Sequence, residues 1–167
     1  MTTETPLVGE EKDTLHAFLK KQRAVMLWKL EDLSDEDLRR PMVPSGTNLL
    51  GMVKHLAAVE YGWFCPTFGV ETEPLPFDES DPESDLRVDP DESTQDILDF
   101  YDRAQAAVDA IIDAHDLDDT GKPWTGEATS LRWIIVHLIE ETARHAGHAD
   151  IIRELIDGGT GYLPPRD

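Results

Sequence analysis

Apolar residues recur at three- and four-residue steps in four long segments of the chain. Residues 10–30 show the pattern clearly, because one stripe contains Leu15, Phe18, Leu19, Val25, Met26 and Leu30. The same spacing returns in residues 48–64, 93–115 and 130–158. It places the apolar side chains along one face of an α-helix, and no segment shows the alternation of a half-buried strand convincingly. The sequence therefore predicts an all-α protein folded as a four-helix bundle.

Residues that cap helices lie at the expected helix ends. Ser93, with Asp96 three residues later, approximates a capping box at the start of the third long helix. The second and fourth helices each have two candidate N-caps, which are Thr47 or Asn48 and Thr129 or Ser130. Ser34 is expected to open a short helical turn, and the pair Gly158–Gly159 to end the last helix.

Residues 71–92, between the second and third helices, have a different composition. They contain ten Asp or Glu residues, one Arg and four prolines. A segment of this kind buries little apolar surface, so we expect a long, solvated crossover along the bundle. Because long connections are uncommon in compact domains, this acidic connection is either disordered or a mobile flap over a site.

Length and charge narrow the classes of function. With 167 residues, the chain is expected to form a single domain, residues 1–167. Acidic residues outnumber basic ones by 35 to 15, and the net charge of −20 argues against binding to nucleic acid or to an anionic membrane. No apolar run reaches the ~18 residues that a membrane span needs. The single cysteine and the absence of a signal sequence lead us to expect a cytoplasmic protein.

The candidate chemistry is concentrated on the fourth long helix. His137, Glu141 and His145 follow one another at four-residue steps and therefore form a ladder on one side of this helix. The same side carries the apolar residues Ile134, Leu138, Ile152 and Leu155, so the ladder is expected to face the bundle interior. Buried ionisable groups need partners, and a metal ion is one such partner.

A third ligand would come from the second long helix. His55 lies beside Met52, Leu56 and Val59 on the apolar face. Together with Glu141 and His145 it would form a His₂Glu set, which leaves a coordination position open as in catalytic zinc sites. Two simpler interpretations stay open, because His55 would also suit a core histidine, and Glu141 with His145 would suit a surface ion pair.

Three further residues lie near this set in the sequence. His137 would serve as a fourth ligand, as a hydrogen-bonding support for a ligand or as a packed neutral ring. His148 would be either a supporting hydrogen-bonding group or a residue at the rim. Arg144 is expected to pair with Glu140 on the solvated face and to help hold a polar substrate.

Two stretches resemble a known family. Residues 131–150 resemble the last helix, and residues 48–60 the second helix, of the DinB-like (YfiT-like) metalloenzymes, and they are most similar to an actinobacterial branch long listed as a domain of unknown function. The resemblance implies a four-helix bundle that binds a divalent metal through His55, Glu141 and His145. Many members have His where this chain has Glu141, and Gln where it has His148. The set His, Glu, His resembles that of the mycothiol-dependent maleylpyruvate isomerases.

The resemblance also implies an activity. Characterised relatives are transferases or isomerases that use a low-molecular-weight thiol, so we expect a metal-dependent S-transferase that joins a mycothiol-type thiol to an electrophile in detoxification or stress. Isomerase chemistry is the second choice. Zinc is the expected ion, with nickel, iron and manganese as alternatives. The expected partners are the small-molecule thiol and the electrophile, and the protein would be a monomer or homodimer. A non-catalytic metal-binding bundle and a metal-water hydrolase are the competing interpretations.

Overall fold

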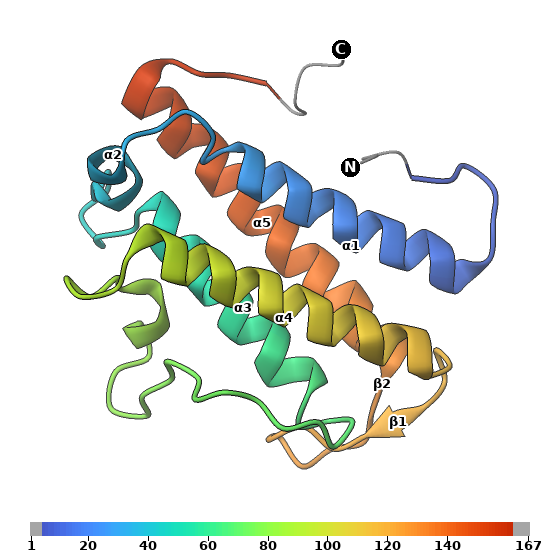
Figure 1. Ribbon diagram of the computed structural model, residues 1–167. Coiled ribbons are helices and arrows are strands. Elements are labelled where there is room, and N and C mark those ends of the chain that lie inside the picture. The colour runs from blue at the N-terminus through green and yellow to red at the C-terminus, as the bar shows by residue number, and fades with distance from the viewer. Residues whose placement is uncertain (1–4, 162–167) are drawn as a thin grey trace.

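Four long helices form the body of the protein. The computed structural model describes residues 5–161, and its long helices are α1 (Glu11–Trp28), α3 (Leu49–Phe64), α4 (Thr94–Ala114) and α5 (Leu131–Asp157). Helix α3 packs against α4 and α5, and α1 packs against α5 (Figure 1). The prediction of an all-α four-helix bundle is confirmed. Within residues 5–161, no helix combines the length and the apolar character that crossing a membrane requires.

Side-chain caps fix where helices α2 to α5 begin, where α2 is the short helix Asp35–Arg39. The Ser93 side chain accepts a hydrogen bond from the backbone of Asp96, whose own side chain accepts one from the backbone of Ser93, which completes a capping box. Of the two candidates before α3, Asn48 is the N-cap, and Ser130 is the N-cap of α5. Ser34 caps the short helix α2 (Asp35–Arg39). Gly158 ends α5 in the left-handed conformation, with φ of 78°.

A pair of very short strands closes the loop between α4 and α5. Strand β1 (Thr120–Gly121) pairs antiparallel with β2 (Thr129–Ser130). These strands were not expected, because two residues are too few to show an alternating pattern. A Cβ atom on Gly121 would lie 1.9 Å from the carbonyl oxygen of Thr67, so only glycine allows β1 to approach the segment after α3 this closely.

Helix α3 is the most enclosed helix of the bundle. Its fully buried side chains include Leu49, Leu50, Met52, Val53, Leu56 and Phe64. The expectation that Leu155 shares the buried side of α5 is wrong, because its side chain is 58% exposed. Leu155 lies six residues after the fully buried Ala149, which places it about 120° away around α5, whereas its neighbour Ile156 packs against the core.

A buried polar network ties three helices together on another side of the core. The guanidinium of Arg23 on α1 donates to both carboxylate oxygens of Glu60 on α3, at 2.8 and 2.6 Å. It also donates to Asp109 on α4, at 2.7 Å, and His16 contacts the same Asp109 oxygen at 2.7 Å. Burial opposes ionisation of Asp109, but His16 and Arg23 outweigh it and hold the pKa of this carboxyl well below its ordinary value.

The acidic connection, residues 71–92, folds back against α3 (Figure 1, light green). It contains a single turn of 3-10 helix, η1 (Ser84–Leu86), which contacts α3. Most of its acidic side chains are exposed, as its composition predicts, but Asp85 is only 4% exposed. Lys54 of α3 holds the end of the connection through the carboxylate of Glu92 and the carbonyl of Arg87, each at 2.8 Å. This segment therefore has defined contacts next to the predicted site.

Candidate metal centre

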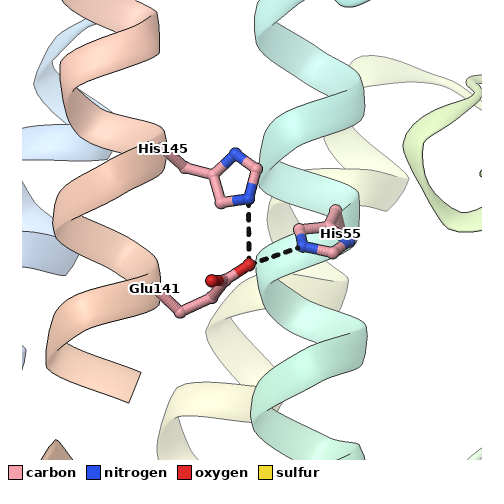
Figure 2. A group of neighbouring side chains, drawn as sticks. All are labelled: His55, Glu141 and His145. Carbon is pink, nitrogen blue, oxygen red and sulfur yellow. Dashed lines mark hydrogen bonds and ion pairs between the residues drawn. The ribbon is translucent and has the colours of Figure 1, made fainter. Parts of the chain in front are cut away.

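Helices α3 and α5 bring His55, Glu141 and His145 together (Figure 2). Nε2 of His55 lies 3.3 Å from Oε1 of Glu141, and Nε2 of His145 lies 3.1 Å from the same oxygen. One donor atom from each residue lies within 4.8 Å of the others. Among residues 5–161, this is the one group of three or more His, Cys, Asp or Glu side chains with such proximity. The three residues that the sequence singled out thus meet in the fold.

The separations between these donor atoms suit a small divalent cation. Ligands of a tetrahedral zinc ion lie about 2.0–2.2 Å from the metal, which places neighbouring ligand atoms about 3.3–3.5 Å apart. The two contacts of Glu141 Oε1 with the imidazoles, at 3.3 and 3.1 Å, are close to that edge length. Two imidazole nitrogens and one carboxylate oxygen also match the ligand types that zinc prefers. The residues present therefore fit the ion that the family resemblance implies.

The charges of the three side chains depend on one another. Burial opposes ionisation of Glu141, but the two imidazoles outweigh it and hold the pKa of Glu141 below its ordinary value. Burial and the neighbouring His55 ring lower the pKa of His145. Burial also disfavours a charged His55, but Asp85 and Glu141 outweigh it and raise the pKa of His55. An ionised carboxylate and neutral imidazoles are the forms that bind a cation, and the raised pKa of His55 means that a proton competes with the cation for this ring.

Asp85 is a site residue that sequence reasoning missed. Its Oδ2 lies 2.7 Å from Nδ1 of His55, and both side chains are largely screened from solvent. A proton on Nδ1 that is donated to Asp85 leaves the Nε2 lone pair of His55 facing Glu141. Nothing in the spacing of the acidic connection distinguishes Asp85 from its nine acidic neighbours.

The close approach of the acidic connection to α3 depends on Gly51, one helical turn before His55. A Cβ atom at this position would lie 2.0 Å from the carbonyl oxygen of Leu86, which follows Asp85. A side chain here would push η1 away from α3 and move Asp85 away from His55. A glycine inside a buried helix, next to the candidate ligand, was the one sequence signal for this contact.

The remaining predicted residues surround the three candidate ligands without joining them. Arg144 is exposed, and its Nη1 lies 3.7 Å from Oε2 of Glu141 while Nη2 lies 3.7 Å from Glu140. His148 is exposed, and its ring meets the His145 ring edge-on at 5.5 Å. Nδ1 of His145 is buried and has no hydrogen-bond partner. His145 is therefore oriented by its contacts with Glu141 and with the neighbouring rings.

His137 extends the ladder away from the candidate ligands and packs among tryptophans. Its ring stacks on Trp133, with centroids 5.1 Å apart and planes 23° apart. It also meets the ring of Trp63 on α3 edge-on, at 4.9 Å. Of the roles considered for His137, the geometry matches that of a packed ring.

Comparison with known proteins identifies the family and the fold of the chain. The family model described as mycothiol-S-transferase matches residues 14–158. A solved structure, titled a crystal structure of the conserved protein of locus from Enterococcus faecalis, has the same fold: the TM-score is 0.65, with 16% identity over 91% of this chain and 100% of that chain. No curated protein matches the chain. The resemblance to the DinB-like (YfiT-like) proteins is thus confirmed, and the chain belongs to the mycothiol-S-transferase family.

Proposed function

We propose that this protein is a divalent-metal-dependent S-transferase that joins a mycothiol-type thiol to an electrophile. The observation that carries the proposal is the convergence of His55, Glu141 and His145 between two helices of a mycothiol-S-transferase family member. Three protein ligands leave at least one coordination position for a substrate, as in catalytic zinc sites. The geometry favours zinc, and metal analysis would distinguish it from nickel, iron and manganese.

Each side chain has a defined task in this proposal. Nε2 of His55, a carboxylate oxygen of Glu141 and Nε2 of His145 hold the ion, and Asp85 keeps the ring proton of His55 on Nδ1. A bound divalent ion supplies Lewis acidity that favours the ionised thiol near neutral pH. The sulfur then forms a bond to the electrophilic carbon, the leaving group departs with its electron pair, and the thiol proton passes to solvent.

Arg144 is the cationic group next to these ligands. Its side chain is 59% exposed and its Nη1 lies 3.7 Å from Oε2 of Glu141, so the guanidinium is accessible to a molecule bound beside Glu141. We assign it to the polar part of the thiol substrate. His148 is exposed, and its ring contacts the ring of His145. We assign His148 to the same polar part of the thiol substrate.

The single cysteine of the chain does not supply the reactive thiol. Cys65 is fully buried at the end of α3, and burial raises the pKa of its thiol to about 11. Because the thiolate is the nucleophilic form, a thiol with this pKa is almost entirely unreactive at neutral pH. The proposed reaction therefore needs an external thiol, which reducing cytoplasm contains in quantity.

The test combines metal analysis with a transfer assay. Mycothiol and monochlorobimane are incubated with the protein as purified, after treatment with a chelator, and after zinc is restored. We expect conjugate formation that needs both the thiol and the metal. Metal binding without thiol-dependent transfer contradicts the proposal and favours a non-catalytic metal-binding bundle. Metal-dependent ester hydrolysis without any thiol requirement contradicts it in favour of a hydrolase.

A further inference from the structure

An apolar hollow of about 410 Å³ lies at the end of α3 beyond His55. It is lined by Gly62 and Pro66 at the end of α3, by Leu75 and Phe77 of the acidic connection, and by Trp124 of the loop between β1 and β2. Gly62 is two helical turns after His55, which places it within about 20° of the same face of α3 and about 10 Å along the axis. The hollow and the candidate metal centre therefore share one face of this helix.

A series of packed aromatic rings lies between the hollow and the candidate metal centre. On α5, His137 lies one turn from Glu141, and Trp133 lies one turn further. Trp63 on α3 meets both of these rings, with centroids 4.9 Å from His137 and 5.1 Å from Trp133. Trp63 also meets Trp124, a lining residue of the hollow, at 4.3 Å. The surface between the helices thus changes from ionisable ligands to aromatic rings within a few turns.

Among residues 5–161, no charged side chain lines the hollow, although the chain carries 35 acidic residues. Two of its rings are largely exposed, Phe77 at 52% and Trp124 at 64%. Exposed aromatic rings gathered around a concave surface are typical of binding sites for small molecules. Their faces and edges favour another flat ring, because offset-stacked and edge-to-face arrangements add to the gain from burying apolar surface.

We propose that this hollow binds the apolar, ring-bearing body of the electrophile. The inference rests on the proposed function and names its substrate class: an uncharged aromatic compound whose reactive carbon extends along α3 toward His55. The volume of about 410 Å³ is within the range of small-molecule sites. The lack of charged lining groups disfavours small polar electrophiles at this position.

The first test measures binding without any reaction. N-phenyl-1-naphthylamine, which is uncharged and fluoresces in apolar surroundings, is titrated into the protein as purified. We expect saturable binding that Trp124→Ala and Phe77→Ala weaken roughly tenfold, because each variant removes one ring of the lining. Gly62→Leu should block the hollow from the α3 side, because a side chain at this position would first meet the edge of the Phe77 ring.

The matched control is Leu155→Ala, which removes another exposed apolar side chain, 58% exposed, from the last turn of α5. Circular dichroism of each variant confirms that the helices are retained. Equal affinity of the wild type and Trp124→Ala, or an equal loss in Leu155→Ala, overturns the inference.

The second test uses the reaction. With N-(2-(1-naphthyl)ethyl)iodoacetamide, whose reactive carbon is on an arm extending from the ring, the sulfur bonds to the carbon that carries iodine, iodide leaves with the electron pair, and the thiol proton goes to buffer. We expect Trp124→Ala to raise KM for this compound roughly tenfold and to leave KM for iodoacetamide, a small polar electrophile, nearly unchanged. If Trp124→Ala changes KM equally for both electrophiles, the inference is overturned.

The two tests also separate the inference from the proposed function. If neither electrophile is conjugated while Trp124→Ala still loses the naphthylamine, the proposed transferase activity is wrong. In that case the assignment of the hollow to an electrophile is overturned as well, and the site binds a different apolar ligand. If transfer proceeds with both electrophiles and the naphthylamine does not bind, only the inference about the hollow is wrong.

Discussion

At the scale of single residues, the two ring nitrogens of His55 contact different partners. Nδ1 faces the buried Asp85 and Nε2 faces Glu141. This arrangement orients the ring and selects the atom that can bind a cation. Glu141 in turn contacts both imidazoles through one oxygen. Loss of Glu141 would remove a contact of both imidazoles, and loss of Asp85 would leave Nδ1 of the half-buried His55 without this partner.

His55→Ala, Glu141→Ala and His145→Ala are each expected to lose the bound metal, because each removes one of three ligands. His115→Ala is the control, since His115 lies at the end of α4 beside Asp119. Inductively coupled plasma analysis of the purified variants measures the metal content. Full occupancy in all three ligand variants, with occupancy unchanged in the control, would show that the ion binds elsewhere.

Asp85→Ala is expected to weaken zinc affinity roughly 10–100-fold, the effect that is typical of losing a carboxylate that orients a ligand histidine. Asp85→Asn should lose less zinc affinity, because its amide oxygen can still accept a hydrogen bond from Nδ1 of His55. Asp91→Ala, which removes an exposed carboxylate from the same connection, serves as the control. Competition with a chromogenic chelator measures each affinity, and equal affinities for all three variants contradict the role of Asp85.

At the scale of elements, the acidic connection and α3 act as one unit. Gly51 lets the connection approach, η1 presents Asp85, and Lys54 holds the end of the segment. The bundle helices alone would place His55 opposite α5 without fixing its ring. A long connection that composition predicts to be solvated therefore contributes a buried residue to the site.

Two glycine-to-alanine changes test this coupling. Gly51→Ala forces a Cβ against the Leu86 carbonyl, so we expect a loss of about 1–3 kcal/mol in the free energy of unfolding together with weaker zinc binding. At Gly147 on α5 a Cβ meets nothing within 4 Å, and Gly147→Ala should stabilise the protein by about 0.5–1 kcal/mol through helix propensity. Urea unfolding measures both changes. Equal stability of the two variants would argue against a tight contact between α3 and the connection.

At the scale of the whole molecule, the network of Arg23, Glu60 and Asp109 links α1, α3 and α4 away from the candidate metal centre. Its carboxylates are buried or half-buried, so their protonation couples the stability of the bundle to pH. Asp109 has the clearest effect, because its pKa is held well below its ordinary value.

The sign of the Asp109 effect follows from its lowered pKa. The unfolded chain binds a proton near pH ~3.9, while the folded protein resists protonation, so the stabilisation is fully present above that pH and is lost as the pH falls through the folded pKa. We expect Asp109→Asn to be less stable than the wild type at pH 7, by an amount that shrinks below pH ~4. Urea unfolding at several pH values measures the difference, and a constant difference from pH 7 to pH 3 would falsify this coupling.

The net charge of −20 also belongs to this scale. We expect no binding to duplex DNA at physiological salt, because the phosphate backbone requires a positively charged contact surface. Electrophoretic mobility shifts over a range of salt concentrations check this. A salt-dependent shift at micromolar protein would require a local basic surface that overcomes the overall charge.

The sequence alone determined the elements that depend on local interactions. Apolar spacing located the four long helices and caps located the starts of three of them, α3, α4 and α5, because both act within a few residues. The pair Glu141 and His145 was readable for the same reason, since residues four apart on a helix are neighbours. The length and acidity of the connection were readable too, but the position of Asp85 was not.

Tertiary packing decided what the local pattern left open. His55 meets Glu141 only because α3 packs against α5 in one register, and 86 residues separate the two in the chain. Asp85 reaches His55 through a contact that depends on the missing side chain of Gly51. His137 has the same spacing as the two ligands on α5, yet it faces Trp63 and Trp133 because it lies beyond the level of His55. Helical periodicity gives the direction of a side chain about its own axis, whereas its partners depend on which residues the other helices bring to the same height.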